Sequence, residues 1–454
     1  MTRFSATVQA RHATALKTSS ATEDESVLRR LALFGYCRIV SDPWDRQQRS
    51  RFVSHELLVG MGADDTSLSA AIARAAEDDL VLAVVHASKE DSVNWPAGAD
   101  DDDRQLVARL LAHAVVSPQL LSILITPSGW EARLWLDSRE PIRAERVAIL
   151  GDRLELFDRE RLAAPDFLAR QDLAFGPQLG CTLRGLRVGV VGCGATGSAT
   201  AMLLARLGVG QLALFDNDIV DVTNLNRLHG TRRADADAMR GKVDVLTREI
   251  TELGLGVRTL PLRGWIGDAA ARDALKACDV VFGCTDDHDG RLLLNRFAYF
   301  YLVPVIDMGL AIRPGAGGQI AELGGRVTVL APGGQCLICR KIVDAQTARD
   351  EALRRASPEE FERRKREAYV RGGGEPAPAV VTFTTATACM AVDELVQGLT
   401  GFRGSGWRWH GVRRFDLLAD RRPGAEQDKH CPVCGDTDYW GRGDVEPFLD
   451  RVGS

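Results

Sequence analysis

Residues 186–310 alternate short apolar runs with amphipathic stretches, and no other feature of the chain restricts its fold as strongly. Buried strands that alternate with helices are typical of a mainly parallel sheet with helices on both faces. The sequence therefore predicts an α/β fold with a doubly wound, Rossmann-like sheet. The expected strands are 186–192, 211–216, 257–262, 279–285 and 303–309, and the expected helices are 196–207, 242–253, 268–276 and 290–300.

The pattern after this region fits the same domain, which we expect to span 160–440, with 441–454 as a tail. The run 372–378 is rich in glycine and proline and indicates a flexible connector. The other expected elements are strands at 317–332 and 412–418, a charged helical stretch at 343–369 and a buried helix at 380–400.

The chain ahead of the alternating region predicts a smaller, mixed α/β domain over 27–155. Residues 1–26 contain no acid before Glu23 and are expected to be flexible or to form a strand, with a targeting segment as the alternative. The acidic run 100–103 is expected in a solvated loop that caps the following helix. The expected strands are 51–59, 80–86, 119–126 and 131–136, and the expected helices are 68–76 and 104–114.

The charge and the apolar pattern exclude several classes of protein. Lys and Arg total 57 against 62 Asp and Glu, so the net charge of −5 argues against a general binder of nucleic acid or anionic membranes. No run of about 18 apolar residues is present that could span a bilayer. Ten cysteines in 454 residues are too few for a disulfide scaffold. These features favour a reducing, cytoplasmic location.

A glycine-rich turn follows the first strand of the alternating region directly. Gly192 permits a tight turn, Gly194 lets backbone N–H groups approach a phosphate, and Gly197 lets the next helix pack closely on the strand. The amino terminus of that helix favours an anion. Asp216 ends the next strand, where a carboxylate can hold a ribose hydroxyl. Up to this point NAD and ATP fit equally well, and a tight turn without a ligand is the alternative.

The residues after Asp216 favour ATP over NAD. The loop carries Asp218, Asn224 and Arg227, and Lys242 begins the next helix. Cations at the phosphate end suit an enzyme that attacks ATP, because negative charge develops on the departing pyrophosphate. Asp286 follows a buried strand at the edge where such sheets bind ligands, and it can hold Mg²⁺. Surface cations and a helix N-cap are the alternative interpretations of these side chains.

Several separated motifs in this order resemble the ThiF/MoeB-like adenylating family, the fold that ubiquitin-activating enzymes share. They are GCGATGSATAMLLARLGVGQLALFDNDIVDVTNLNR, the pair GK at 241–242, and GCTDDHDGRLLLNR at 283–296. The resemblance covers about 165–440, and Ala195 stands where many members have Gly. It implies binding of Mg-ATP and adenylation of a carboxyl-terminal carboxylate with release of pyrophosphate.

The resemblance also implies roles for individual residues. Asp216 would hold the ribose, and Asp286 would bind Mg²⁺. The phosphates would be held by Asn224, Arg227 and Lys242. The segment ARQDLAFG places Arg170 where the family has an arginine that usually reaches the ATP of the partner subunit, so a homodimer is implied.

Two CxxC pairs predict a metal site. Cys336 and Cys339 form the first pair, and Cys431 and Cys434 form the second. Four thiolates complete a closed tetrahedral zinc site with no open position for catalysis, so we expect a structural role. Members of the resembled family often carry both pairs. A labile disulfide and a site without metal are the alternatives.

Ubiquitin-activating enzymes often transfer the adenylated carboxylate to a cysteine, which in the resembled family tends to follow the first CxxC pair. The segment 340–379 contains no cysteine. The nearest candidate for a thioester nucleophile is Cys389, which lies in an apolar helix and is more simply explained as core packing. The enzyme is therefore expected to stop at the adenylate and leave the carboxylate to a separate partner.

The amino-terminal domain weakly resembles the JAB/JAMM metalloproteases over about 50–115. The resemblance rests on Glu56, His86 and the acidic run 100–103, but Ser88 stands where the family has its second histidine. The proline-serine element is also blurred, at 95–97. With one imidazole missing, catalytic zinc is not expected. The resemblance implies an inactive module that recognises a ubiquitin-like tail or a partner.

These observations together favour an ATP-dependent enzyme that adenylates a ubiquitin-like or sulfur-carrier protein in a bacterial-type conjugation pathway. A conjugating-enzyme partner is a further expectation. Three alternatives stay open: the same fold could adenylate a short peptide or another small carboxylate, the chain could be an NAD-dependent oxidoreductase, or it could be a non-catalytic scaffold. The last would be expected to lack the Arg227, Lys242 and Asp286 set, and all three are present.

Overall fold

The chain forms two compact units. The computed structural model describes residues 3–22, 32–58, 65–77, 80–89, 95–112, 119–137, 139–366, 378–424, 426 and 428–443. Unit 1 comprises Met1–Arg161 together with Trp440–Arg442, and unit 2 comprises Leu162–Tyr439 together with Gly443–Ser454. None of the described helices combines the length and the apolar character that crossing a membrane requires.

Unit 1 is built on one mixed sheet with a packed core on each face. Its described strands are ordered β7-β6-β5-β4-β2-β3-β1-β8-β9. Helix α1 contributes Ala13 and Leu16 to one core, while α2 and α3 contribute Ile72 and Val107 to the other. The elements are β1 (Arg3–Gln9), α1 (Ala10–Thr22), β2 (Ala32–Asp42), β3 (Gln47–Leu58), α2 (Asp65–Glu77), β4 (Val81–Ala87), α3 (Ala99–Ala112), β5 (Leu120–Ile125), β6 (Trp130–Trp135), β7 (Ile142–Arg143), β8 (Arg146–Leu150) and β9 (Leu154–Asp158).

Residues 3–22 form β1 and α1, so the strand-forming expectation is confirmed for residues 3–9 and the expectation of a flexible stretch is wrong for residues 3–22. Strand β1 lies inside the sheet and pairs in parallel with both β3 and β8. Phe4 and Val8 are fully buried. Alternating apolar side chains along the strand supply the core, and this outweighs the absence of acidic residues that suggested a flexible segment.

The acidic run of unit 1 also lies differently from the expected loop. Asp100, Asp101 and Asp102 form the first turn of α3, where carboxylates favour the positive end of the helix dipole. Asp103 continues the helix and is fully buried. The expectation of a wholly solvated loop is therefore wrong, because the helix begins before the run and turns its fourth acid into the core.

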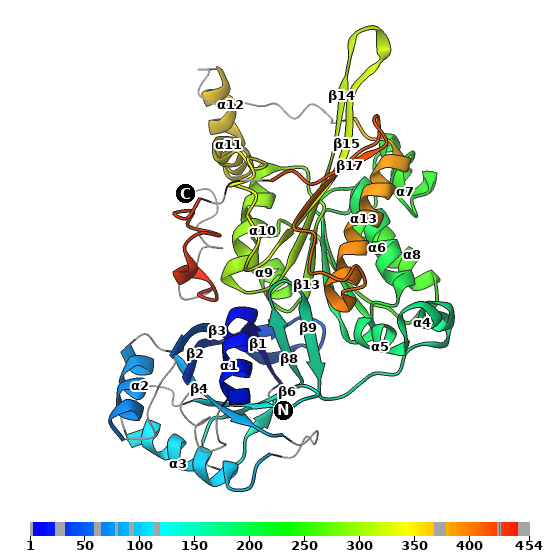
Figure 1. Cartoon of the computed structure of the whole chain (residues 1–454). Coiled ribbons are helices and arrows are strands. Elements are labelled where there is room, and N and C mark those ends of the chain that lie inside the picture. The colour runs from blue at the N-terminus through cyan, green and yellow to red at the C-terminus, as the bar shows by residue number, and fades with distance from the viewer. Residues whose placement is uncertain are drawn as a thin grey trace. The chain divides into compact units, whose positions relative to one another are not determined.

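Unit 2 confirms the doubly wound sheet. Its described strands are ordered β12-β11-β10-β13-β14-β15-β16-β17, and the strands from β12 to β14 are parallel. Figure 1 shows α6, α8 and α13 on one face and α9 and α10 on the other. The strands are β10 (Arg187–Val191), β11 (Gln211–Phe215), β12 (Arg258–Leu262), β13 (Val280–Gly283), β14 (Val305–Pro314), β15 (Ile320–Leu330), β16 (His410–Arg414) and β17 (Ala419–Arg421).

The helices of unit 2 follow the expected alternation in its parallel half. They are α4 (Ala169–Phe175), α5 (Pro177–Gly185), α6 (Ala195–Leu207), α7 (Arg233–Asp237), α8 (Lys242–Glu252), α9 (Ala269–Lys276), α10 (His288–Phe300), α11 (Ala345–Ala356), α12 (Pro358–Arg366) and α13 (Val381–Thr400). Short 3-10 turns occur at η2 (Asp166–Leu168), η3 (Val222–Asn224), η4 (Ala316–Gly318) and η5 (Thr437–Tyr439). Residues 372–377 of the expected connector lie outside the described residues.

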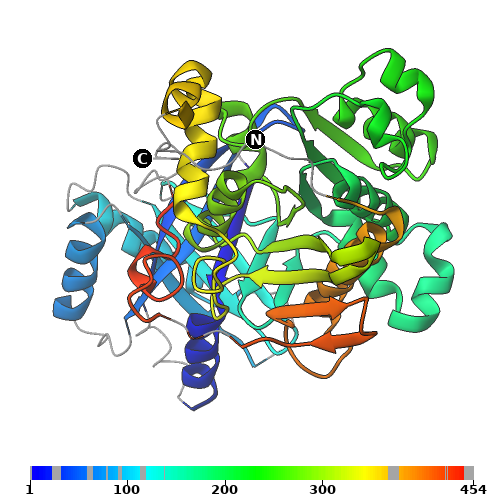
Figure 2. The ribbon, with the colours of Figure 1, turned by 90° about the horizontal axis from the view of Figure 1, so that it is seen from above.

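The second half of the unit 2 sheet is antiparallel. Strand β14 runs past the expected end at residue 309 and forms a long hairpin with β15, which projects in Figure 1. Strand β16 pairs with β15, and Figure 2 shows the β16–β17 hairpin beside it. The single strand expected at 412–418 is instead the end of β16 followed by a turn at 415–418.

The burial of β1 predicts that replacing Phe4 by alanine destabilises unit 1. The expected loss is about 3–5 kcal/mol of unfolding free energy, because a fully buried ring leaves a cavity. Hydrogen exchange of unit 1 peptides measures this separately from unit 2. Ser5→Ala, at the partly exposed next position, is the control. Equal protection in the two variants would contradict a structural role for β1.

Candidate active site

A cavity of about 550 Å³ lies in unit 2 at the carboxyl ends of its parallel strands. Gly192 and Gly194 border it after β10, Asp216 borders it after β11, and Asp286 borders it after β13. In open parallel sheets, ligands bind at this edge and at the point where the strand order reverses. Here the order reverses between β10 and β13, the two strands that lead into the glycine loop and into Asp286.

The glycine loop adopts the close-packed turn that its spacing predicts. Gly192 has a positive φ of 86°, and a Cβ atom there would lie 2.9 Å from the backbone of Cys284. A Cβ atom on Gly197 would lie 1.7 Å from the Gly192 carbonyl oxygen, so only glycine lets α6 start this close to β10. Gly194 is the N-cap of α6 and has open space on its Cβ side, which leaves its backbone accessible to an anion.

Asp216 ties the glycine loop to the loop after β11. Its Oδ2 atom accepts a hydrogen bond from Cys193 N at 2.6 Å, and its Oδ1 atom accepts one from Asp218 N at 2.8 Å. Burial raises the pKa of this carboxyl group. Each carboxylate oxygen has a further lone pair, so Asp216 keeps the capacity to accept from a ribose hydroxyl.

Lys242 lies in the cavity as a paired cation. Its Nζ atom contacts the Asp218 carboxylate at 2.7 Å. Burial lowers the pKa of Lys242, but the carboxylates of Asp216 and Asp218 outweigh it and raise the pKa overall. The ammonium group therefore stays charged at neutral pH, as binding of a polyphosphate requires.

Asn224 and Arg227 also border the cavity, but each has a local partner. The Asn224 side-chain oxygen accepts from Asp221 N at 3.2 Å and completes a capping box of the turn η3. Arg227 is partly buried and donates to the Thr223 carbonyl oxygen and, at 3.2 Å, to the Asn226 side chain. Both bonds of Arg227 are local to one turn, so the guanidinium can turn toward a ligand.

The carboxylates after β13 differ in their surroundings. Asp287 accepts from the Thr285 hydroxyl, so its side chain turns back onto its own loop. The Asp286 side chain is exposed, and within the described residues no hydrogen bond or ion pair is recorded for it. Asp286 is therefore the carboxylate with oxygen atoms available to a metal ion that bridges phosphates.

Three residues that sequence reasoning did not single out also line the cavity: Trp265, Ile266 and Arg291. Trp265 follows β12 and supplies an aromatic wall. Arg291 donates to the Asp286 carbonyl oxygen at 3.3 Å and lies 3.6 Å from the buried Asp307 carboxylate. The position of Arg291, five residues after Asp286 on the first turns of α10, is the sequence signal that could have identified it.

Two candidate residues lie away from the cavity. Arg170, on α4, is exposed and is not among the described residues that line it. Cys389, on α13, is also absent from the lining and is exposed, so the expectation of core packing is wrong. Apolar residues of α13 occupy exposed positions as well as buried ones, so the apolar sequence around Cys389 does not show that its side chain is buried. Burial of part of the thiol, with a smaller contribution from Asp393, raises the pKa of Cys389 and disfavours a thiolate.

The four cysteines of the CxxC pairs converge within unit 2. Their sulfur atoms all lie within 4.8 Å of one another, with 3.7 Å between Cys336 and Cys431 and 3.5 Å between Cys339 and Cys434. A tetrahedron with metal–sulfur distances of about 2.3 Å has edges of about 3.8 Å, so this set fits zinc. All four are free thiols in the structure, with no disulfide between them. Four thiolates leave no open position, in agreement with a structural role.

The resemblance of unit 1 to a metalloprotease is not confirmed. His86 Nε2 contacts Asp103 Oδ1 at 2.9 Å, and Ser122 donates to Asp103 Oδ2 at 2.6 Å. Arg133 binds Asp103 at 2.6 Å and Asp100 at 2.5 Å, so a guanidinium supplies the cation between these acids. Among the described residues, the four cysteines are the only cluster close enough to hold a metal.

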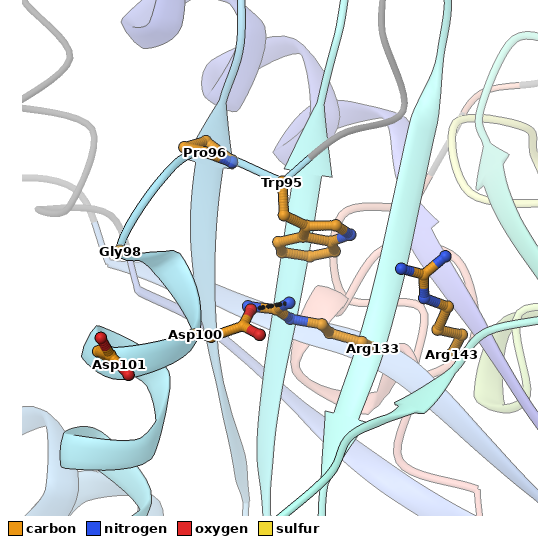
Figure 3. A pocket seen from close by; sticks show the side chains of 7 residues that line it. All are labelled: Trp95, Pro96, Gly98, Asp100, Asp101, Arg133 and Arg143. Carbon is orange, nitrogen blue, oxygen red and sulfur yellow. Dashed lines mark hydrogen bonds and ion pairs between the residues drawn. The ribbon is translucent and has the colours of Figure 1, made fainter.

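The same arginine forms the floor of a second, smaller cavity in unit 1. Figure 3 shows Trp95 over the Arg133 guanidinium, 3.8 Å from the ring centroid, and Asp100 reaching it from α3. Burial alone would raise the pKa of Asp103, but its bonds with His86, Ser122 and Arg133 lower the pKa overall. Glu56, the other candidate ligand, pairs with Arg74 at 3.1 Å. The acids that border this cavity, of about 390 Å³, are Asp100, which pairs with Arg133, and Asp101, which pairs with Arg104 at 3.1 Å.

Comparison with known proteins gives a family and several relatives. The model of the ThiF family matches residues 168–433, more than half of the chain. The molybdopterin-synthase adenylyltransferase of Salmonella typhimurium is 36% identical over 131 residues, which cover 29% of this chain and 51% of that protein. The SAMP-activating enzyme E1 of Haloferax volcanii is 29% identical over 164 residues, covering 36% of this chain and 56% of that protein.

A third relative extends the match. The adenylyltransferase and sulfurtransferase MOCS3 of Mus musculus is 31% identical over 202 residues, covering 44% of this chain and 39% of that protein. The chain thus spans between about two fifths and just over half of the length of these three relatives.

The two later glycines of the loop predict opposite effects of the same substitution. Gly194→Ala should leave the melting temperature unchanged, because its Cβ side is open, but weaken ATP binding by about tenfold or more by blocking the approach of phosphate. Gly197→Ala should destabilise unit 2 through the contact with Gly192. Calorimetric titration with ATP and thermal melting measure the two effects. Unchanged ATP binding in a folded Gly194→Ala variant would contradict the assignment of the loop.

The cysteine cluster predicts one zinc ion per chain. Cys431→Ser should remove it and lower the melting temperature, because zinc binding free energy contributes to folding. Elemental analysis of the purified protein gives the stoichiometry. Cys181→Ser, outside the cluster, is the matched control and should retain the metal. Full zinc content in the Cys431→Ser variant would exclude this site.

Proposed function

The chain belongs to the ThiF family, and from this we propose that it is an adenylyltransferase that activates a carboxylate with Mg-ATP. The observation that carries the proposal is the composition of one cavity. It brings together the glycine loop, Asp216, Lys242 and the unpaired Asp286 from the ends of separate strands and helices. These groups match the phosphates, the ribose and the metal of a bound nucleotide.

The proposed reaction is in-line attack of the substrate carboxylate on the α-phosphate of ATP. The carboxylate oxygen forms a bond to phosphorus as the bond to the bridging oxygen of pyrophosphate breaks. Lys242 and Arg227 stabilise the negative charge that develops on the departing pyrophosphate. Asp286 would hold Mg²⁺, which would supply further neutralisation of the phosphates. The glycine loop orients the nucleotide through its backbone N–H groups.

The cavity favours an ATP enzyme over the two other classes considered. A nicotinamide enzyme has no use for a lysine and an arginine at the phosphate end together with a free carboxylate. A non-catalytic scaffold has no reason to keep Lys242 charged by two carboxylates inside a cavity. The preserved set of Arg227, Lys242 and Asp286 therefore supports catalysis.

We propose that the substrate is the carboxyl terminus of a ubiquitin-like or sulfur-carrier protein. Relatives named as a molybdopterin-synthase adenylyltransferase and a SAMP-activating enzyme support this class. A short peptide is the second candidate for the same chemistry. The raised pKa of Cys389 and its distance from the lining favour a pathway in which a separate partner, such as a conjugating enzyme, takes the carboxylate. The proposed location is the cytoplasm, and unit 1 is proposed as the recognition module.

A homodimer is part of this proposal. Arg170 lies on α4 among exposed apolar side chains, including Leu173 at 89% exposure and Phe175 at 42%. Exposed apolar side chains around one charged group are typical of a surface that a partner covers. A second copy would bury this surface and could bring Arg170 to its ATP.

The proposal predicts ATP–pyrophosphate exchange that depends on a carboxylate substrate. The assay uses a panel of ubiquitin-like proteins that end in Gly-Gly, sulfur-carrier proteins and short peptides. Exchange with a protein supports the proposed substrate, and exchange with peptides alone supports the second candidate. Asp286→Asn should lower the exchange rate by about a hundredfold or more, because the variant loses an anionic ligand for Mg²⁺.

The control for this variant is Asp237→Asn on α7, which removes an exposed carboxylate that pairs with Arg233. It should exchange at the wild-type rate. Full activity of a folded Asp286→Asn variant would show that the metal assignment is wrong. Binding of NAD in preference to ATP by the wild-type chain would refute the proposed enzyme class.

A further inference from the structure

Helix α11 packs against the first turn of α10, which directly follows the Asp286 loop. The Asp344 backbone N–H donates to His288 Nδ1 at 3.0 Å. The Glu351 Oε2 atom accepts from His288 N at 2.7 Å and from Asp289 N at 2.8 Å. Three hydrogen bonds therefore join α11 and its N-cap to two consecutive residues of α10.

Glu351 supplies a cap that α10 does not provide for itself. Asp287 is the N-cap residue of α10, but its side chain makes no capping hydrogen bond and instead accepts from the Thr285 hydroxyl. The first N–H groups of a helix need acceptors, and a carboxylate there also favours the positive end of the dipole. Because the acceptor comes from α11, the placement of this first turn depends on a separate segment of the chain.

Arg355, one turn further along α11, makes two more contacts. Its guanidinium forms an ion pair with Asp289, whose side chain is fully buried. The guanidinium carbon also lies 3.4 Å from the centroid of the Trp265 ring, a cation–π contact. Trp265 is a wall of the nucleotide cavity. One arginine thus joins the helix that follows Asp286 to the aromatic wall after β12.

We propose that α11 is a positioning element of the active site, in which Glu351 and Arg355 fix the metal carboxylate and the aromatic wall relative to each other. The inference rests on the proposed function, since it assigns the site to Mg-ATP. Trp265 follows β12 and Asp286 follows β13, and Arg355 contacts both Trp265 and Asp289, at the start of the helix that follows Asp286. A shift of Asp286 or of Trp265 would weaken binding of Mg-ATP, although every side chain that contacts the nucleotide would still be present.

The test compares Arg355→Met with Arg354→Met. Methionine keeps an unbranched aliphatic side chain but is shorter and has neither the charge nor the planar guanidinium that stacks on Trp265. Arg354 is the preceding arginine on the same helix and, like Arg355, is exposed. Arg355→Met should raise the KM for ATP and the half-saturating Mg²⁺ concentration about tenfold or more in the exchange assay. Arg354→Met should change both by about twofold at most.

Three further variants separate positioning from folding. Trp265→Leu removes the ring without disturbing the Asp289 ion pair, and it should raise the KM for ATP in a folded protein. Glu351→Ala removes the cap, whereas Glu351→Gln keeps an oxygen that both N–H groups can reach. The alanine variant should reproduce the Mg²⁺ shift, and the glutamine variant should restore at least part of the wild-type dependence.

The outcomes are distinguishable. Wild-type ATP and Mg²⁺ dependence in folded Arg355→Met and Glu351→Ala variants would overturn the proposal. Variants that only lower the folded fraction, with unchanged dependence in what remains folded, would also overturn it and leave α11 a packing role. Failure of the wild-type chain to bind Mg-ATP in calorimetry would instead refute the proposed function itself.

Discussion

The reversal of strand order between β10 and β13 is the constraint on which the site depends. The connections after these two neighbouring parallel strands run to opposite faces of the sheet, to α6 and to α10 (Figure 1). Neither helix covers the edge between them, so a crevice must remain there. The groups that would bind a nucleotide lie around this crevice. The glycine loop follows one strand and Asp286 follows the other, so both arise from the topology itself.

A residue of this site could be predicted from the sequence when its contacts lie within a few residues of it along the chain. The glycine loop could be predicted, because the turn, the phosphate approach and the close packing of Gly197 are set within six residues. Lys242 and Asp286 could be predicted to border one cavity, because the carboxyl ends of parallel strands lie at the same edge as the starts of the helices that follow them. Trp265, Glu351 and Arg355 could not, because their contacts join loops and helices that no periodicity relates.

The wrong expectations have physical reasons of the same kind. Residues 3–9 could be predicted only as flexible or strand-forming, because their composition also resembles that of a polar leader, whereas Phe4 and Val8 lie inside a sheet. Cys389 was expected in a core because α13 is apolar, but an apolar helix still has one side that faces away from its neighbours. Asp103 was expected in water, yet Arg133 and His86 compensate its buried charge. In each case the environment depends on which distant segments pack against the residue, and for Cys389 none of the described segments buries it.

The cysteine cluster has a consequence for how the chain can vary. Cys336 and Cys431 meet although 95 residues separate them, and α11, α12 and α13 all lie within the loop that they close. Both ends of that loop are held at one point. Doubling the length of a flexible loop raises the entropic cost of closing it by only about 0.6 kcal/mol, so loop length has a small effect on the free energy of unfolding. Insertions in the connections between these helices should therefore be tolerated, whereas changes within α13, β16 or β17 would disturb the sheet or the helix that packs on it. Evolution can remodel the segment that carries α11, and with it the positioning of the active site, without rebuilding the sheet.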